Sequence, residues 1–203
     1  MVANWPTGSP NPGTTGSSLL NAVRLREALS WQRLVDLYGP LIYGWCRTAG
    51  CQPNDAADLV QDVFVALERN IDSLRHDKQS NRFRAWLRTV TRNKIRDHYR
   101  ANARTPTAAG GTNGGAQLAN VPSIDSADDD DAQLVELANL LERALQMVKD
   151  DFEDSTWQAF WLSTVDGRST PEIAAELHMT HNAIRQAKFR VIKRLRDEFG
   201  DLV

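Results

Sequence analysis

The stretch PEIAAELHMTHNAIRQAKFRVIKRLRDEF, residues 171–199, decides the fold of the C-terminal part of this 203-residue chain. Its apolar residues recur at spacings of three and four, which predicts helices rather than strands. We expect a short helix over 171–177, a tight turn at 178–180 and a longer helix over 181–199. This order is that of a helix-turn-helix, whose second helix enters the major groove of DNA.

The second helix of this motif carries side chains that suit DNA. Arg, Asn and Gln hydrogen-bond base edges, and Arg also contacts phosphates. Phe189 has two interpretations, as a contact for a thymine methyl group or as part of the core. Helical hairpins are common, so the pattern alone does not separate a DNA reader from an ordinary hairpin. The candidates at or near the reading surface are Asn182, Arg185, Gln186 and Arg190.

Positive charge is concentrated in this helix and in one other segment. The formal net charge of −2 gives no sign of a nucleic-acid binder, which is usually basic. However, 14 of the 24 Lys and Arg residues fall within 82–104 and 181–196, beside a single acid, Asp97. In the first segment Arg recurs every four residues from Arg84 to Arg100, which makes a cationic stripe on a helix. One stripe is often only a solvated face, but two favour phosphate binding.

Low-complexity segments divide the remainder of the chain. Residues 1–18 are rich in Pro, Gly, Ser and Thr, which predicts a disordered tail, and the Gly-rich residues 105–131 predict a flexible linker. No stretch alternates with period two, so no sheet is expected. The predicted fold is therefore all-α, with two small helical domains at 19–104 and 132–203 joined by the linker; the second contains the helix-turn-helix.

Turn-forming residues predict where the helices of the first domain end. Breaks at Gly39-Pro40, at 50–53 and at 75–82 separate four helices.

In the second domain Gly167 ends one helix, and either Ser169 or Thr170 caps the next. The acidic run Asp125 and Asp128–Asp131 favours a helix N-terminus through the helix dipole, or is a solvated end of the linker. One face of the first helix of this domain is predicted to carry Leu134, Leu137, Leu141, Leu145 and Val148.

Composition argues against several classes of protein. Two cysteines cannot form a disulfide framework, no apolar run reaches the roughly 20 residues of a membrane helix, and the N-terminus lacks a signal peptide, so we expect a reduced, cytoplasmic protein. His178 and His181 lack a third ligand, so no metal is expected. There is no phosphate-binding glycine loop or nucleophile elbow, so we expect neither an enzyme nor a cofactor.

Three passages resemble one family, the bacterial RNA polymerase sigma factors of the extracytoplasmic-function (ECF) type. They are DAADLVQDVF at 55–64, FRAWLRTVTRNK at 83–94, and residues 168–196 with the helix-turn-helix. The resemblance implies a protein that binds core RNA polymerase and directs promoter recognition, DNA melting and transcription initiation at a specific set of promoters. It also implies that residues 19–104 form region two, for polymerase and the minus-ten element, and that residues 132–203 form region four, for the minus-thirty-five element.

The resemblance assigns roles to individual positions. An acidic strip would meet the clamp helices of the polymerase β′ subunit, and a polar loop would capture an unstacked promoter base, whose extrusion costs a few kcal/mol. The flap of the β subunit and an anti-sigma protein are further implied partners. The implied residues are Asp58, Gln61 and Asp62 for polymerase; Lys78, Gln79, Ser80 and Asn81 for the unstacked base; Thr89, Arg92, Asn93 and Arg96 for minus-ten DNA; and Arg185, Gln186, Phe189 and Arg190 for minus-thirty-five DNA, joined by Asn182.

Several alternatives stay open at this stage. The acidic strip could be a solvated helix face, and Trp86 could stack on a base, although a core role is favoured. The main rival function is a helix-turn-helix repressor or activator that binds as a homodimer, whereas a free sigma factor is expected to be a monomer. A further hypothesis is that the acidic run at 125–131 attracts the two basic helices, so that the domains pack on one another and hide their DNA faces.

Overall fold

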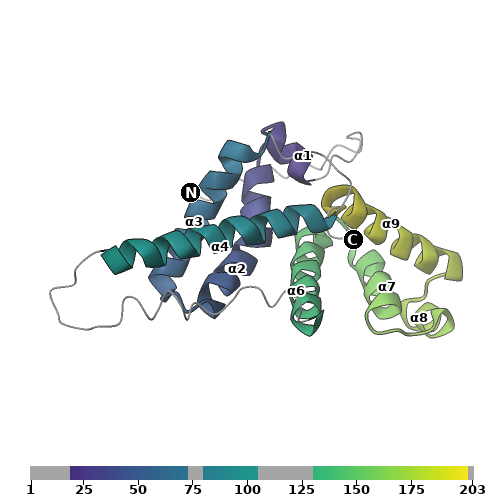
Figure 1. The fold of residues 1–203 in the computed structure, drawn as a ribbon. Coiled ribbons are helices and arrows are strands. Elements are labelled where there is room, and N and C mark those ends of the chain that lie inside the picture. Colours follow the sequence, from purple (N-terminus) through teal and green to yellow (C-terminus); the bar gives the residue numbers. More distant parts are fainter. Residues whose placement is uncertain (1–18, 73–79, 105–129, 201–203) are drawn as a thin grey trace, which may run out of the picture.

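The computed structural model describes residues 19–72, 80–104 and 130–200, and over these residues the chain is helical without strands (Figure 1). The predicted all-α class is confirmed. The expected tail at 1–18 and residues 105–129 of the expected linker lie outside the described residues. The helices are α1 (Leu19–Arg24), α2 (Ser30–Thr48), α3 (Pro53–Asn70), α4 (Ser80–Arg104), α6 (Asp130–Lys149), α7 (Asp154–Thr164), α8 (Thr170–Leu177) and α9 (His181–Phe199).

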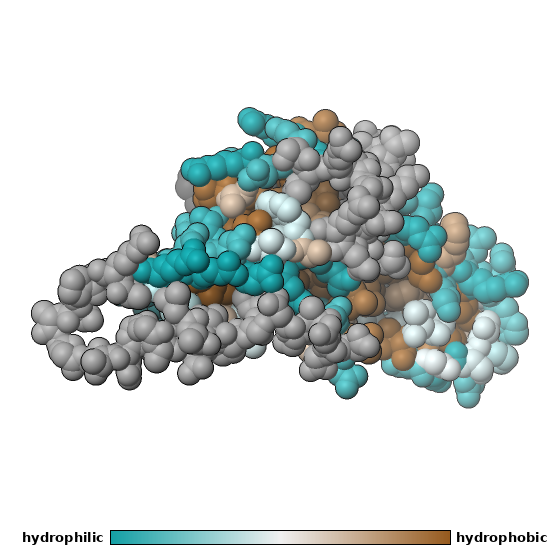
Figure 2. Space-filling view, viewed as in Figure 1, coloured by the Kyte–Doolittle hydropathy of each residue, from teal (hydrophilic) through white to brown (hydrophobic). Residues whose placement is uncertain are grey.

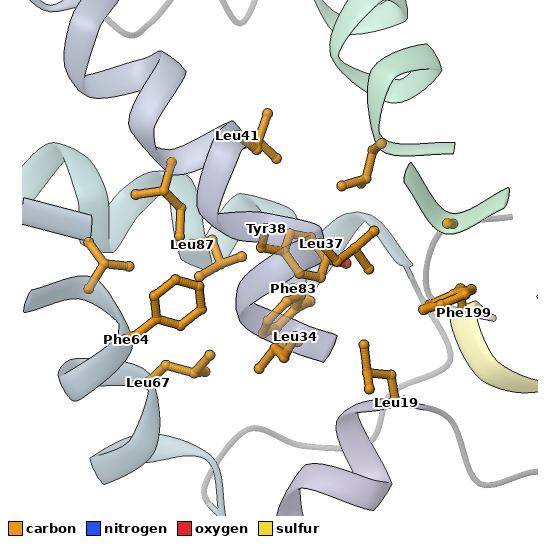
Figure 3. Close-up of a cluster of buried hydrophobic side chains, with 14 of the residues drawn as sticks. Leu19, Leu34, Leu37, Tyr38, Leu41, Phe64, Leu67, Phe83, Leu87 and Phe199 are labelled. Carbon is orange, nitrogen blue, oxygen red and sulfur yellow. The ribbon is translucent and has the colours of Figure 1, made fainter. Parts of the chain in front are cut away.

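In the first half of the chain, α1 packs on α2, and α2, α3 and α4 pack on one another. Each helix turns one apolar face inward, as its spacing of three and four predicts. Figure 3 shows Leu34, Phe64 and Leu87, from three different helices, meeting in this core. Burial of such a side chain stabilises the fold by about 1.5–3 kcal/mol. The residues of this half with less than 2% exposure include Leu34, Leu37, Ile42, Val63, Leu67, Leu87 and Ile95.

The expected break at Gly39-Pro40 is wrong, because α2 runs through both residues. Proline lacks the N–H that would bond to the carbonyl four residues earlier, which normally ends a helix. Here the buried face of α2 continues on both sides of Pro40, so apolar packing outweighs the lost bond. The chain breaks instead between α1 and α2, where Arg26 and Leu29 have positive φ angles of 53° and 65°.

In the second half, α7 packs along α9, and α8 packs on both. A small core of Ala159, Ile173, Ile184 and Ala187 joins these three helices. Ser169 rather than Thr170 is the residue that caps α8: its backbone N–H and its hydroxyl donate to Glu172, at 2.9 and 2.7 Å. These bonds lower the pKa of Glu172.

The predicted apolar face of α6 is only partly buried. Its C-terminal half packs inward through Leu145 and Val148, which are 8% and 0% exposed. Toward its N-terminus, Leu134 and Leu141 are 62% and 38% exposed, because no other described helix covers that side. Leu140 and Ala144, one position away from the predicted face, are fully buried instead.

The two halves are in contact through α6, which stands between α2 and the α7–α9 group (Figure 1). One continuous cluster of buried side chains includes Leu37 of α2, Val148 of α6 and Phe199 of α9. In Figure 3, Phe199 lies beside the core of the first half, near Leu19 and Leu37. The described parts of the two halves therefore form one compact body.

Two free cysteines, Cys46 and Cys51, are buried at the turn between α2 and α3. The turn bends at Gly50, whose φ of +86° favours glycine, and the hydroxyl of Tyr99 donates to the carbonyl of Ala49 at 3.0 Å. Burial is the main cause that raises the pKa of Cys46 to about 12, with a smaller effect from Cys51. No helix in the described part of the chain is long and apolar enough to cross a membrane.

Candidate nucleic-acid interface

Helix α4 presents one polar face outward because its other face is anchored in the core. Phe83, Leu87 and Ile95 are buried, and the outer surface of the helix forms a band of hydrophilic residues (Figure 2). Trp86 packs against the same core and stacks on Phe83, with ring centroids 6.4 Å apart, which favours a structural role for its ring.

The polar residues of α4 are not equally available to a ligand. Asn93 and Arg96 are exposed, and neither has a hydrogen bond or ion pair within the ranges the structure covers. Thr89 is also exposed, but its hydroxyl donates to the carbonyl of Ala85 at 2.9 Å. Arg92 is half-buried, and Lys94 lies 3.6 Å from the carboxylate of Asp62 on α3. Asn93 and Arg96 are thus the freest of the predicted minus-ten residues.

Helix α9 is amphipathic in the way that a reading helix requires. Ile184, Ala187 and Val191 are buried against α7 and α8, so the opposite face points to solvent. The core interpretation of Phe189 is wrong, since this ring is 64% exposed. The predicted reading residues Asn182, Arg185, Gln186 and Phe189 follow one another at helical spacing and are all exposed.

The turn before α9 sets the start of this face. His178 takes a left-handed conformation with φ 52°, a geometry in which glycine is usual. Thr180 then caps α9, where its hydroxyl oxygen accepts a bond from the backbone N–H of Ala183 at 3.2 Å. Arg168 pairs with Glu176 at 2.6 Å, which ties the preceding loop to α8. In the described residues no group of three His, Cys, Asp or Glu side chains could hold a metal ion.

Farther along α9, Arg190 and Arg194 are engaged by the protein itself. Arg190 is exposed, yet its guanidinium donates to the hydroxyl of buried Thr156 on α7 at 3.4 Å. Arg194 pairs with Asp151 at 2.8 Å and also with Glu198. The first two turns of α9 are therefore open to a ligand, whereas Arg190 and Arg194 help to hold α9 in place.

An acidic strip runs along α3. Asp58, Gln61 and Asp62 are exposed, at spacings of three and four that place them on one side of the helix. The apolar residues predicted to point inward, Leu59, Val63, Phe64 and Leu67, are all buried.

Four predicted residues cannot be placed in the same way. Lys78 and Gln79 lie outside the described residues, and Ser80 and Asn81 are in the first turn of α4, where only the backbone is described.

Sequence reasoning missed the polar contacts that join the two halves, and the cluster around Glu136 is one of them. Glu136 on α6 accepts a bond from the indole N–H of Trp45 at 2.8 Å and pairs with Arg88 at 2.6 Å. The guanidinium of Arg88 also lies over the ring of Trp45, 5.2 Å from its centroid. Nothing in the local pattern pairs these residues, which are up to 91 positions apart.

Comparison with known proteins places this all-helical chain, with its two outward basic faces, among DNA-binding transcription proteins. The family model Sigma-70 region 2 matches residues 34–105. The chain is 30% identical to RNA polymerase sigma factor CnrH of Cupriavidus metallidurans, over 75% of this chain and 77% of that protein. It is 26% identical to ECF RNA polymerase sigma factor SigE of Mycolicibacterium smegmatis, over 96% of this chain and 71% of SigE. It is 24% identical to ECF RNA polymerase sigma factor BldN of Streptomyces coelicolor, over 87% of this chain and 63% of BldN.

The chain belongs to the RNA polymerase sigma factors of the ECF type. It therefore acts with RNA polymerase to direct transcription initiation at specific promoters. This membership decides against the alternative of a helix-turn-helix repressor or activator.

Proposed function

We propose that the two halves of this sigma factor divide promoter recognition between them. The half with α1 to α4 binds core polymerase and minus-ten DNA, and the half with α6 to α9 binds minus-thirty-five DNA. The observation that carries the proposal is the outer face of α9, where four side chains suited to bases are exposed opposite a buried apolar face.

On α9, each exposed side chain has a chemical role in this proposal. The guanidinium of Arg185 can donate two bonds to O6 and N7 of a guanine, and the amide of Gln186 can pair with an adenine. Phe189 offers an apolar surface to a thymine methyl group. Asn182, in the first turn, adds a polar contact beside them. Arg190 reaches a phosphate or a base from its position beside Thr156.

On α4, Arg92 and Arg96 supply positive charge for phosphates, and Asn93 supplies a donor and an acceptor for a base edge. Thr89 contributes its hydroxyl oxygen as an acceptor, since its hydrogen is directed to Ala85. Melting of the promoter belongs to this half in the proposal, with the unstacked base captured by residues from Lys78 to Asn81, of which Ser80 and Asn81 begin α4.

The acidic strip of α3 is the proposed contact with the clamp helices of the β′ subunit, and the second half is the proposed contact with the β flap. A salt bridge to Asp62 is already present within the chain, because Lys94 lies 3.6 Å away. Lys94 is on α4, so a partner that engages Asp62 would also affect the helix proposed to bind DNA. We propose that the free chain is a monomer and that an anti-sigma protein is a candidate regulator.

The test is size-exclusion chromatography of the chain with core polymerase, followed by transcription in vitro on a library of genomic fragments. We expect co-elution and transcripts that start at a discrete set of sites. Asp62→Lys should abolish co-elution while the second half still binds promoter DNA, and Arg185→Ala should co-elute but lose promoter selectivity. A chain that fails to co-elute with core enzyme would overturn the proposal.

A further inference from the structure

The contact between the two halves is a built interface with an apolar centre and a polar cluster at each end. Its centre is the shared core, in which Leu140, Ala144 and Val148 of α6 are fully buried. Helix α6 contacts α2 along this core and contacts α9 on its other side. Apolar side chains of this kind are favourable only when they are shielded from water. Their burial against α2 therefore keeps α6 in this position.

At one end, the carboxylate of Glu136 is held by two groups of the first half, Trp45 and Arg88. The side chains of Arg88 and Glu136 are 22% and 27% exposed, so water screens this pair only in part. A carboxylate that accepts two directed hydrogen bonds is stabilised more than a carboxylate in a single surface ion pair.

At the other end, Glu198 of α9 pairs with Arg33 of α2 at 2.5 Å, and its side chain is 9% exposed. Arg33 also donates to the backbone carbonyl of Met147, at the end of α6, at 3.5 Å. Two arginines of the first half, Arg33 and Arg88, therefore each form an ion pair with one carboxylate of the second half.

Docking leaves the proposed DNA faces open, contrary to the expectation that they would be hidden. Asn93 and Arg96 on α4, and Arg185 and Phe189 on α9, are all exposed in the docked arrangement. Asp131, at the described end of the acidic run, is exposed and takes no part in the described contacts that join the halves. What docking fixes is the separation of the two faces.

That separation does not suit the target of the proposed function. A compact chain of this length has a radius of gyration of about 17 Å, and hence a diameter of roughly 40 Å. Elements centred near minus ten and minus thirty-five are about 25 base pairs apart, or roughly 85 Å at about 3.4 Å per base pair. The chain between Arg104 and Asp130, about 25 residues, spans roughly 80–90 Å when fully extended, so the halves can separate that far.

We propose that the structure is a closed state of this sigma factor, in which Glu136 latches the second half to the first through Trp45 and Arg88. The inference rests on the proposed division of promoter recognition. Opening releases α6, frees Arg88 in the cationic stripe of α4, and lets the two halves reach their separate elements. Because only the open fraction binds both elements, the latch reduces the apparent affinity for polymerase and promoter by that fraction.

The test measures the distance between the halves directly, without polymerase. Exposed Arg69 on α3 and exposed Asp166 after α7 are changed to Cys and labelled with a dye pair for single-molecule energy transfer; the two natural cysteines are buried. Glu136→Gln keeps the shape of the side chain and removes its charge. Glu142→Gln, an exposed position on the same helix, is the matched control.

We expect Glu136→Gln to raise the ratio of open to closed molecules about tenfold, the loss of roughly one charge-assisted hydrogen bond, and Glu142→Gln to leave the ratio unchanged. Trp45→Phe, which keeps an aromatic ring and removes the N–H donor, should shift the ratio in the same direction. Equal distance distributions for wild type, Glu136→Gln and Glu142→Gln would overturn the latch.

The same variants separate the latch from the proposed function. When the wild type is mostly closed, Glu136→Gln should bind core polymerase about tenfold more tightly than the control. A wild type that never binds core enzyme would refute the proposed function, whereas its distance distribution would still report the latch. Unchanged core affinity together with a shifted distance distribution would overturn the inhibitory role of the closed state.

Discussion

The guanidinium of Arg33, in the first turn of α2, lies 2.5 Å from the carboxylate of Glu198, in the last turn of α9. The two residues come from opposite ends of the described chain, and Glu198 also pairs with Arg194 of its own helix. This carboxylate thus joins α2, in the first half, to α9, in the second half. It is one of the few buried charged groups among the described residues, with 8% of the residue exposed.

Glu198→Gln should lower the free energy of unfolding by about 1–3 kcal/mol, because two partly buried guanidinium groups lose their charged acceptor. Urea denaturation followed by circular dichroism measures the change. Glu142→Gln, at an exposed site on α6, should stay within about 0.5 kcal/mol of the wild type. Identical midpoints for the two variants would show that Glu198 contributes no more than a surface carboxylate.

Two glycines of the first half should respond to alanine in opposite directions. Gly39 lies inside α2, and a Cβ there would meet Phe64 and Val35 at 3.9 Å, an ordinary contact, so Gly39→Ala should stabilise the protein by about 0.5–1 kcal/mol. At Gly50 the φ of +86° disfavours any Cβ, which would also lie 3.4 Å from the Tyr99 hydroxyl. Gly50→Ala should destabilise by about 1–2 kcal/mol. Thermal or urea unfolding of both variants checks the signs, and a stabilised Gly50→Ala would contradict this account of the turn.

Cys46 should resist alkylation in the native protein. With its pKa raised from 9.0 to about 12 by burial, the thiolate fraction at pH 8 falls about 1,000-fold below that of the unfolded chain. Iodoacetamide labelling followed by mass spectrometry, with and without urea, measures this difference. Labelling of Cys46 at equal rates in both conditions would contradict the burial described here.

The same pKa predicts how stability changes at alkaline pH. Between about pH 9 and 12 the unfolded chain loses the Cys46 proton while the folded chain keeps it, so stability falls as pH rises through this range. Below pH 9 both states are protonated and this group has no effect on the pH dependence. The urea midpoint should therefore be lower at pH 10 than at pH 8. In Cys46→Ser this decrease should be smaller.

Arg185→Ala should weaken binding to the minus-thirty-five element by about 1–3 kcal/mol, the loss of one bidentate base contact. Fluorescence anisotropy with the cognate promoter and with a scrambled duplex separates base reading from phosphate binding. Arg69→Ala removes the same charge from an exposed site on α3 and serves as the control. An equal loss on both duplexes would identify Arg185 as a phosphate contact rather than a base reader.

Local sequence pattern predicted much of this structure, because helix faces depend on residues three and four positions apart. The spacing of Ile184, Ala187 and Val191 buries one side of α9, and this leaves Arg185 and Gln186 on the other. The same reasoning placed Asp58 and Asp62 on the outer side of α3. The family resemblance came from these same passages.

Local pattern failed where distant packing overrode it. At Pro40 the missing backbone bond predicted a break, but the apolar face on both sides keeps α2 continuous. Phe189 has a large apolar side chain of the kind usually found in a core. Only the position of α7 and α8 on the other side of α9 shows that it is exposed.

The sequence by itself determined most of the helices and their inward faces, and the two concentrations of positive charge, since these depend on neighbours within a few positions. Only the tertiary structure decided which face covers which. Glu136 could have remained a solvated carboxylate on α6, and Arg88 one more cation of a stripe. Their pairing, and that of Arg33 with Glu198, arises because α6 buries its apolar residues against α2. This packing depends on contacts between residues more than a hundred positions apart.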